Sequence, residues 1–245
     1  MSDLSRGVLA LLLSAAAASG ASPDAAALLA RAERPRDAFP EGVVTIRVTV
    51  TGAAPGRPDP APARFEVAVK GRRSRVKFLE PGDEGKYVVW SGGGAWLLLP
   101  TAKNPIGIPA SYRVRGGLSS ADVAQAGFGA DYDAVLERED ELAGMTCAVL
   151  RLTAKKGLPV PYPVVRVWID RKDGLYRKAV FLLTSGKTAK EATFDIWATE
   201  RGATVLKRMT IADALRPGTT VVEYLDWSKR PVPDRRLDPA TARQE

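Results

Sequence analysis

The chain has 245 residues, of which 45% are hydrophobic and 26% charged, and its formal net charge is +8. This composition allows one sizeable buried core but carries too many charges for a membrane-embedded bundle. The sequence contains no histidine, so the usual general base near neutral pH and the commonest transition-metal ligand are both missing. Ser-His-Asp and Cys-His catalysis and most zinc chemistry are thereby excluded, and we expect no metal and no cofactor. The net positive charge favours acidic partners, but it does not distinguish anionic lipid from nucleic acid.

The N-terminus has the pattern of an export signal. Arg6 precedes an uncharged stretch rich in Leu and Ala, residues 7–18, and the small residues around Ala21 suit a signal peptidase. The stretch is shorter than the roughly 20 residues that span a bilayer as a helix. We therefore expect a signal peptide over residues 1–21, cleaved after Ala21, and a single domain over residues 22–245. Because Asp3 weakens the positive charge before the stretch, an uncleaved anchor is the alternative.

Cys147 is the only cysteine and lies in an apolar run, residues 147–150. It has no partner for an internal disulfide, so we expect it to pack as a small hydrophobic residue. A reactive or intermolecular thiol is the alternative.

The first elements are a short helix and two strands. An Ala/Leu-rich helix is expected over residues 23–34, capped by Ser22 or Asp24 and ended by Pro35. From residue 43 apolar and polar residues alternate, which indicates a strand. The alternation resumes at residue 65, after a Pro/Ala/Gly-rich connection. The residues on the apolar face of the first strand are Val44, Ile46, Val48 and Val50.

A basic stretch, residues 70–77, follows in the next strand. Its cations alternate with Ser74, Val76 and Phe78, as on the solvent face of an antiparallel strand. Contact with lipid or a partner is the alternative. The aromatic residues of a single-strand binder are not interleaved with these cations, so we expect no nucleic acid.

A hairpin and a short helix complete the first half. The strands over residues 87–90 and 95–100 flank a Gly-rich turn that leads into a strand and lacks the Lys-Ser/Thr of a phosphate loop. A helix over residues 121–127 is expected to begin at Ser119 or Ser120.

The second half repeats strands and turns without helices between them, which is typical of an antiparallel meander. The expected strands cover residues 134–139, 147–154, 164–170, 177–183, 191–197, 205–211 and 219–225. The acidic run over residues 137–141 lacks calcium-loop spacing and is interpreted as a charged hairpin end. The Pro-rich tail from about residue 230 should lie along the surface.

A sheet of this many strands is expected to curl. With only two short helices available as a cover, the curl can leave an apolar cavity. The predicted fold class is mainly β: a curled antiparallel sheet that forms an unclosed barrel, with a short helical lid over the cavity.

Several short motifs resemble a known family. They lie at residues 78–86, 96–100, 104–106, 119–122, 131–132, 136–144, 167–170, 185–187 and 209–213. Together they resemble the outer-membrane lipoprotein-sorting proteins, a group similar to the periplasmic lipoprotein carrier LolA. The resemblance extends over residues 34–238.

The resemblance implies a monomeric periplasmic carrier that binds acyl chains of lipoproteins or lipids and ferries them toward the outer membrane. Its partners would be an inner-membrane transporter and an outer-membrane acceptor. The insertion at residues 53–62 and the loop at residues 106–109, which is less basic than in the family, leave the ligand and the partners open.

The cavity lining is predicted from strand period, and a slip of one residue would invert a strand. Core packing is the alternative role for each residue. The predicted lining residues are Val44, Ile46, Val48, Phe65, Val67, Phe78, Trp90, Trp96, Leu98, Val167, Phe181 and Phe194.

Two other functions stay open. A non-catalytic sensor module of the same fold would bind a membrane protein in the envelope. A hydrolase without histidine would need a pair such as Ser185 and Lys187, which the pattern instead places in a hairpin turn, so no catalytic residue is predicted.

Overall fold

The computed structural model describes residues 23–37, 39–54, 56–124, 127–158 and 160–243, so the predicted signal peptide lies outside the described residues. The first half contains α1 (Pro23–Asp37), β1 (Glu41–Thr51), β2 (Ala63–Lys70), β3 (Arg73–Phe78), β4 (Tyr87–Ser91), β5 (Gly94–Leu98), β6 (Ile106–Ile108), β7 (Arg113–Arg115), β8 (Leu118–Ser119) and α2 (Ser120–Ala124). The second half contains β9 (Tyr132–Leu142), β10 (Met145–Ala154), β11 (Val164–Asp170), β12 (Tyr176–Leu182), β13 (Thr188–Glu200), β14 (Ala203–Asp213), β15 (Thr219–Ser228) and the 3-10 helix η1 (Asp234–Leu237).

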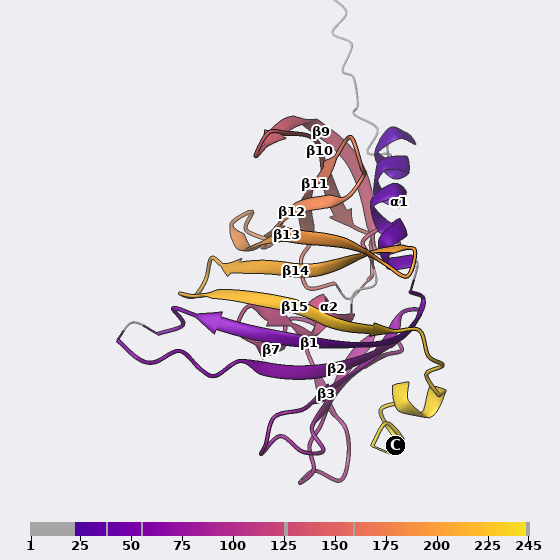
Figure 1. Ribbon diagram of the computed structural model, residues 1–245, viewed down its shortest axis with the longest axis vertical. Helices are drawn as coiled ribbons and strands as arrows, with labels where there is room; N and C mark the ends of the chain where they lie inside the picture. Colours follow the sequence, from indigo (N-terminus) through magenta and orange to yellow (C-terminus); the bar gives the residue numbers. More distant parts are fainter. Residues whose placement is uncertain (1–22, 38, 55, 125–126, 159, 244–245) are drawn as a thin grey trace, which may run out of the picture.

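One large antiparallel sheet dominates the molecule. Its 13 strands follow the order β6-β5-β4-β3-β2-β1-β15-β14-β13-β12-β11-β10-β9, so β6 and β9 are its two edges and the barrel is not closed. The halves meet where β1 pairs with β15, for example Val48 opposite Val222. The predicted fold class is confirmed. Figure 1 shows the curl of the sheet, with α1 lying against β9, β11 and β14.

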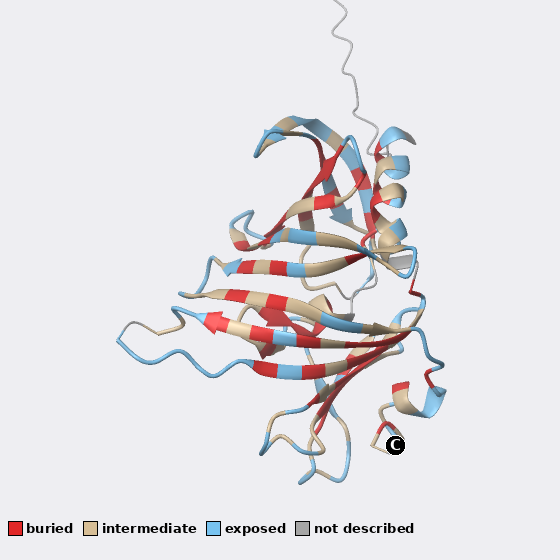
Figure 2. Ribbon diagram, viewed as in Figure 1, coloured by how far each residue is buried: buried red, intermediate tan, exposed pale blue. Residues whose placement is uncertain are grey.

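The alternation in the sequence of β1 sets which side of the sheet is buried. Val44, Ile46 and Val48 are all at most 3% exposed, whereas Arg47 on the other side is exposed. Figure 2 shows this alternation continuing along β2. The main hydrophobic core therefore lies on the concave side, where Val44 and Ile46 join Phe65 of β2.

Helix α1 is longer than predicted. It continues through Pro35 to Asp37 rather than ending before the proline. A proline here removes one backbone hydrogen bond, and so close to the C-terminus that loss does not stop the last turn. None of the described helices is long and apolar enough to cross a bilayer.

Helix α2 begins with a reciprocal cap. The backbone N–H of Asp122 donates to Ser119 Oγ at 3.3 Å, and the N–H of Ser119 donates to Asp122 Oδ2 at 2.7 Å. Ser119 is thus the cap, as expected. The helix is described as far as Ala124, and residues 125–126 of the predicted span lie outside the described residues.

The basic stretch in β3 is not simply a solvated face. Arg75 is 1% exposed and donates to the carbonyl of Ala242 at 2.7 Å, while Asp234 accepts from Lys70 and Arg73. The C-terminal segment 229–243 therefore packs on the convex face of the first half. The predicted surface position of this tail understates its role, because it buries part of that face.

Two smaller features complete the sheet. The acidic run lies within β9, where Glu137 accepts from Arg166 at 2.7 Å and Asp140 accepts from the indole N–H of Trp168 at 2.9 Å. Cys147 is a free thiol that is fully buried in a cluster on the convex side with Trp168.

Candidate functional site

A cavity of about 710 Å³ lies on the concave side of the sheet. This volume is within the range of small-molecule sites. Side chains of α1, α2 and strands from both halves line it, and most of them are apolar. The aliphatic part of the wall includes Val44, Ile46, Val67, Val69, Leu118, Val205, Leu206, Met209, Ile211 and Val222.

Aromatic rings form a second part of the wall. Tyr176 lies 5.5 Å from Phe194, and Phe194 stacks on Trp197 at 6.3 Å, measured between ring centroids. Phe128 contacts Tyr176 edge-on at 5.9 Å. A separate aromatic group, Phe39 with Trp227 at 5.1 Å, lines the cavity as well. Contacts between rings restrict the motion of each ring, so together they form an ordered apolar surface.

Six predicted lining residues lie on the cavity wall: Val44, Ile46, Val67, Trp90, Phe181 and Phe194. Their contact with a ligand stays a prediction. Four others, Val48, Phe65, Phe78 and Val167, face the same side but are buried in the core rather than placed on the wall. The same core cluster contains Val114 of β7, and within it Phe65 packs edge-on against Phe78 at 5.0 Å. These four side chains are therefore part of the filled core rather than of the cavity wall.

Trp96 and Leu98 are on the wrong face for the predicted role. In β5 it is Leu97 that joins the concave core, whereas Leu98 packs with Tyr87 and Ala242 on the convex side and Trp96 is 36% exposed. The prediction failed because β5 is apolar at consecutive positions, so no alternation marked its inner face. The C-terminal segment hides the outer face and allows it to be apolar too.

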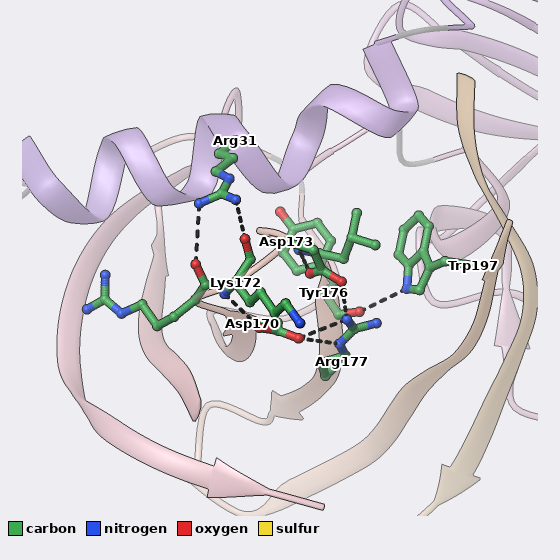
Figure 3. A network of polar contacts seen from close by, with 9 residues as sticks. Arg31, Asp170, Lys172, Asp173, Tyr176, Arg177 and Trp197 are labelled. Atoms are coloured by element: carbon green, nitrogen blue, oxygen red, sulfur yellow. Dashed lines mark hydrogen bonds and ion pairs between the residues drawn. The ribbon is translucent and has the colours of Figure 1, made fainter. Parts of the chain in front are cut away.

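Arg31 fastens helix α1 over the second half of the sheet. Its guanidinium donates to the backbone carbonyls of Arg171 at 3.4 Å and Lys172 at 2.8 Å, as Figure 3 shows. Gly174 of the same turn has a φ of +77°, and a Cβ there would come within 2.3 Å of the Arg31 side chain. The turn thus needs glycine to admit this contact.

Hydrogen bonds within the β11–β12 turn hold it in shape. Asp170 accepts from the Lys172 N–H at 2.8 Å and from Arg177 at 2.9 Å. Burial raises the pKa of Asp170, but these hydrogen bonds outweigh it and hold the pKa below its ordinary value. The Trp197 indole donates to the carbonyl of Tyr176 at 3.1 Å, which links this turn to the aromatic wall (Figure 3).

Glu33 attaches α1 at the cavity itself. Its carboxylate accepts from the Tyr176 hydroxyl at 2.6 Å and from the Phe128 backbone N–H at 2.9 Å. All three residues line the cavity. The helix therefore covers the cavity through polar contacts as well as through its buried residues Ala25, Leu29 and Ala32.

An ion pair spans part of the cavity wall between the two halves. Arg72, in the turn between β2 and β3, lies 2.6 Å from Asp131, in the loop before β9. Both residues line the cavity, and Arg72 is 62% exposed. Lys155 donates to the carbonyls of Gly129 and Ala130 and so fixes the loop that carries Asp131. We call the Arg72–Asp131 pair the clasp.

A second ion pair is buried. Lys190 of β13 contacts Asp122 of α2, and both residues line the cavity. Its ammonium also lies over the rings of Phe181 at 4.8 Å and Tyr162 at 5.1 Å. Burial, and next the charge of Asp122, raise the pKa of Tyr162 above its ordinary value.

Sequence reasoning missed these polar residues and the loop aromatics. Glu33 and Lys190 lie in no motif, and Asp122 ends the motif at residues 119–122 but has no predicted role. Phe128 lies in a loop, where period gives no information. A period of two would place Trp197 opposite Phe194, and register shifts in β13 between the two residues bring both to the cavity.

Ser185 and Lys187 lie in the predicted hairpin turn. Both are exposed between β12 and β13, and neither lines the cavity. The described residues contain no cluster of three or more His, Cys, Asp or Glu that could hold a metal ion.

An open antiparallel barrel around an apolar cavity, with a helix over one side, defines a protein of the LolA-like class. The model of a family described as "Uncharacterized protein"-like matches residues 70–241, more than half of the chain, and the chain belongs to this family. No curated protein matches the sequence.

Solved structures confirm the class. A LolA superfamily protein from Nitrosomonas europaea is 26% identical, with a TM-score of 0.79 over 87% of this chain and 97% of that one. A DUF1329 family protein from Desulfovibrio piger is 18% identical, with a TM-score of 0.76 over 90% and 98%. A putative outer membrane lipoprotein-sorting protein domain from Vibrio parahaemolyticus is 13% identical, with a TM-score of 0.76 over 90% and 99%.

Proposed function

We propose that this protein is a periplasmic carrier, which binds acyl chains of lipoproteins or lipids in the cavity and ferries them toward the outer membrane. The observation that supports this most is the apolar cavity of about 710 Å³ on the concave side of an unclosed sheet. The proposal includes export through a signal peptide over residues 1–21, cleaved after Ala21. It also includes handover between an inner-membrane transporter and an outer-membrane acceptor.

The driving force for binding would be removal of hydrocarbon from water. Each buried CH₂ contributes about 0.8 kcal/mol, so a long acyl chain gains enough to offset the cost of its own ordering. The wall needs no catalytic group for this purpose. Aliphatic side chains such as Val44 and Ile211, and rings such as Phe194, suffice.

Helix α1 would act as a lid. Its contacts through Arg31 and Glu33 can be exchanged for water when it moves, and such hydrogen bonds contribute only about 0.5–1.5 kcal/mol each in net terms. A cover held in this way can open without unfolding the sheet. Entry and release of the acyl chain would then follow the movement of α1.

Paired aspartate substitutions on the two faces test the proposal. Phe194→Asp places a charge on the cavity wall, whereas Trp96→Asp places one on the exposed outer face as the matched control. We expect lipid to co-purify with the Trp96→Asp variant and the parent protein but not with folded Phe194→Asp. Folding is checked by circular dichroism. Retention of lipid by folded Phe194→Asp would count against the cavity as the binding site.

A further inference from the structure

The Lys190–Asp122 pair is an unusual feature of a wall that is otherwise mostly apolar. Both residues line the cavity, and their side chains are only 4% and 10% exposed. Each of two desolvated charges carries a large energetic cost before they pair, and an apolar pair of similar volume is often as stable. Packing alone does not require charges at this position.

The ammonium of Lys190 has more hydrogen-bond donors than described acceptors. It carries three protons, and among the described residues Asp122 is the one acceptor that it contacts. Its other close neighbours are the faces of the Phe181 and Tyr162 rings. Asp122, in contrast, has further hydrogen-bond donors, because Oδ2 also accepts from the backbone N–H and the hydroxyl of Ser119.

The charge balance of the pair selects the class of ligand group. Lys190 and Asp122 together are neutral, so a carboxylate or phosphate would bring an unbalanced negative charge next to Asp122 in a poorly solvated site. An uncharged carbonyl accepts from the ammonium without adding charge. Hydrogen bonds to a charged donor are stronger than neutral ones.

We infer that the Lys190–Asp122 pair recognises an uncharged ester or amide carbonyl of an acylated ligand. The inference rests on the proposed function and adds a chemical class to it. The carbonyl accepts from Lys190, and the hydrocarbon beyond it lies on the neighbouring apolar wall, which includes Phe181 and Ile211. The site then prefers acyl esters and amides over both plain hydrocarbons and free fatty-acid anions.

Displacement of an apolar fluorescent dye by dodecane, methyl laurate and laurate at pH 8 tests the preference. The main variant is Lys190→Met/Asp122→Asn, which removes both charges together and keeps a side-chain oxygen that can accept from the Ser119 N–H. The single variant Lys190→Met is measured beside it. Lys178→Met is the matched control, because Lys178 lies on the adjacent strand and pairs with Glu191 over the Trp168 ring on the convex side.

We expect the parent protein and Lys178→Met to bind methyl laurate more tightly than laurate. In the double variant we expect the affinity for methyl laurate to fall about tenfold or more, while that for dodecane stays unchanged. Two results in the double variant would overturn the inference alone: an unchanged affinity for methyl laurate, or equal changes for methyl laurate and dodecane. A parent protein that prefers laurate to methyl laurate would overturn it too. Failure of the parent protein to bind any of the three probes would overturn the proposed function as well.

Discussion

At the scale of single residues, one ion pair adds a contact between the two halves of the cavity wall. The clasp between Arg72 and Asp131 connects a turn of the first half to a loop of the second at 2.6 Å. Because Arg72 is 62% exposed, solvent screens the pair and it adds little to global stability. Its effect should therefore be local, on the passage of ligand past that part of the wall.

Arg72→Ala should speed the release of bound ligand several-fold at low salt and leave the melting temperature nearly unchanged. At high salt the parent protein should approach the variant, because ions screen the exposed charge of the clasp. Stopped-flow release of a fluorescent acyl ester measures both rates. Arg47→Ala is the control, since it breaks an exposed pair with Glu223 on residues that do not line the cavity. Identical release from both variants would refute a role for the clasp.

At the scale of elements, alternation in the sequence predicted the sheet well and the cavity only in part. Strands such as β1 alternate cleanly, so both their existence and their inner face follow from the period. In β5 consecutive residues are apolar, and the inner face depends on the C-terminal segment that covers the outer one. The positions of Glu33 and Lys190 depend on contacts between distant segments, which no local pattern encodes.

Helix α1 is the element whose mobility should control access. Arg31→Met keeps the aliphatic stem beside Gly174 but removes two hydrogen bonds to the β11–β12 turn. We expect faster amide hydrogen exchange in α1 and faster ligand release, with exchange in β1 and β15 unchanged. Mass spectrometry of exchanged peptides resolves these regions. Uniform acceleration across the sheet would instead show that Arg31 supports the whole fold.

For the molecule as a whole, the pairing of β1 with β15 brings both ends of the chain into one curved sheet. The sheet stays open between β6 and β9, and on its concave side some side chains pack together as core while others line a cavity. This division explains why six predicted lining residues lie on the wall and four are packed in the core. Carriage requires that the remaining space take up hydrocarbon.

The most direct test is mass spectrometry of lipid extracted from the mature protein after isolation from its own periplasm. The proposed function predicts acylated molecules at a defined ratio to protein, reduced to background in folded Phe194→Asp and retained in Trp96→Asp. Protein that is isolated free of acyl chains, and that takes up none from added lipid, would contradict carriage. Capture of a membrane protein by such lipid-free protein would favour the sensor module instead.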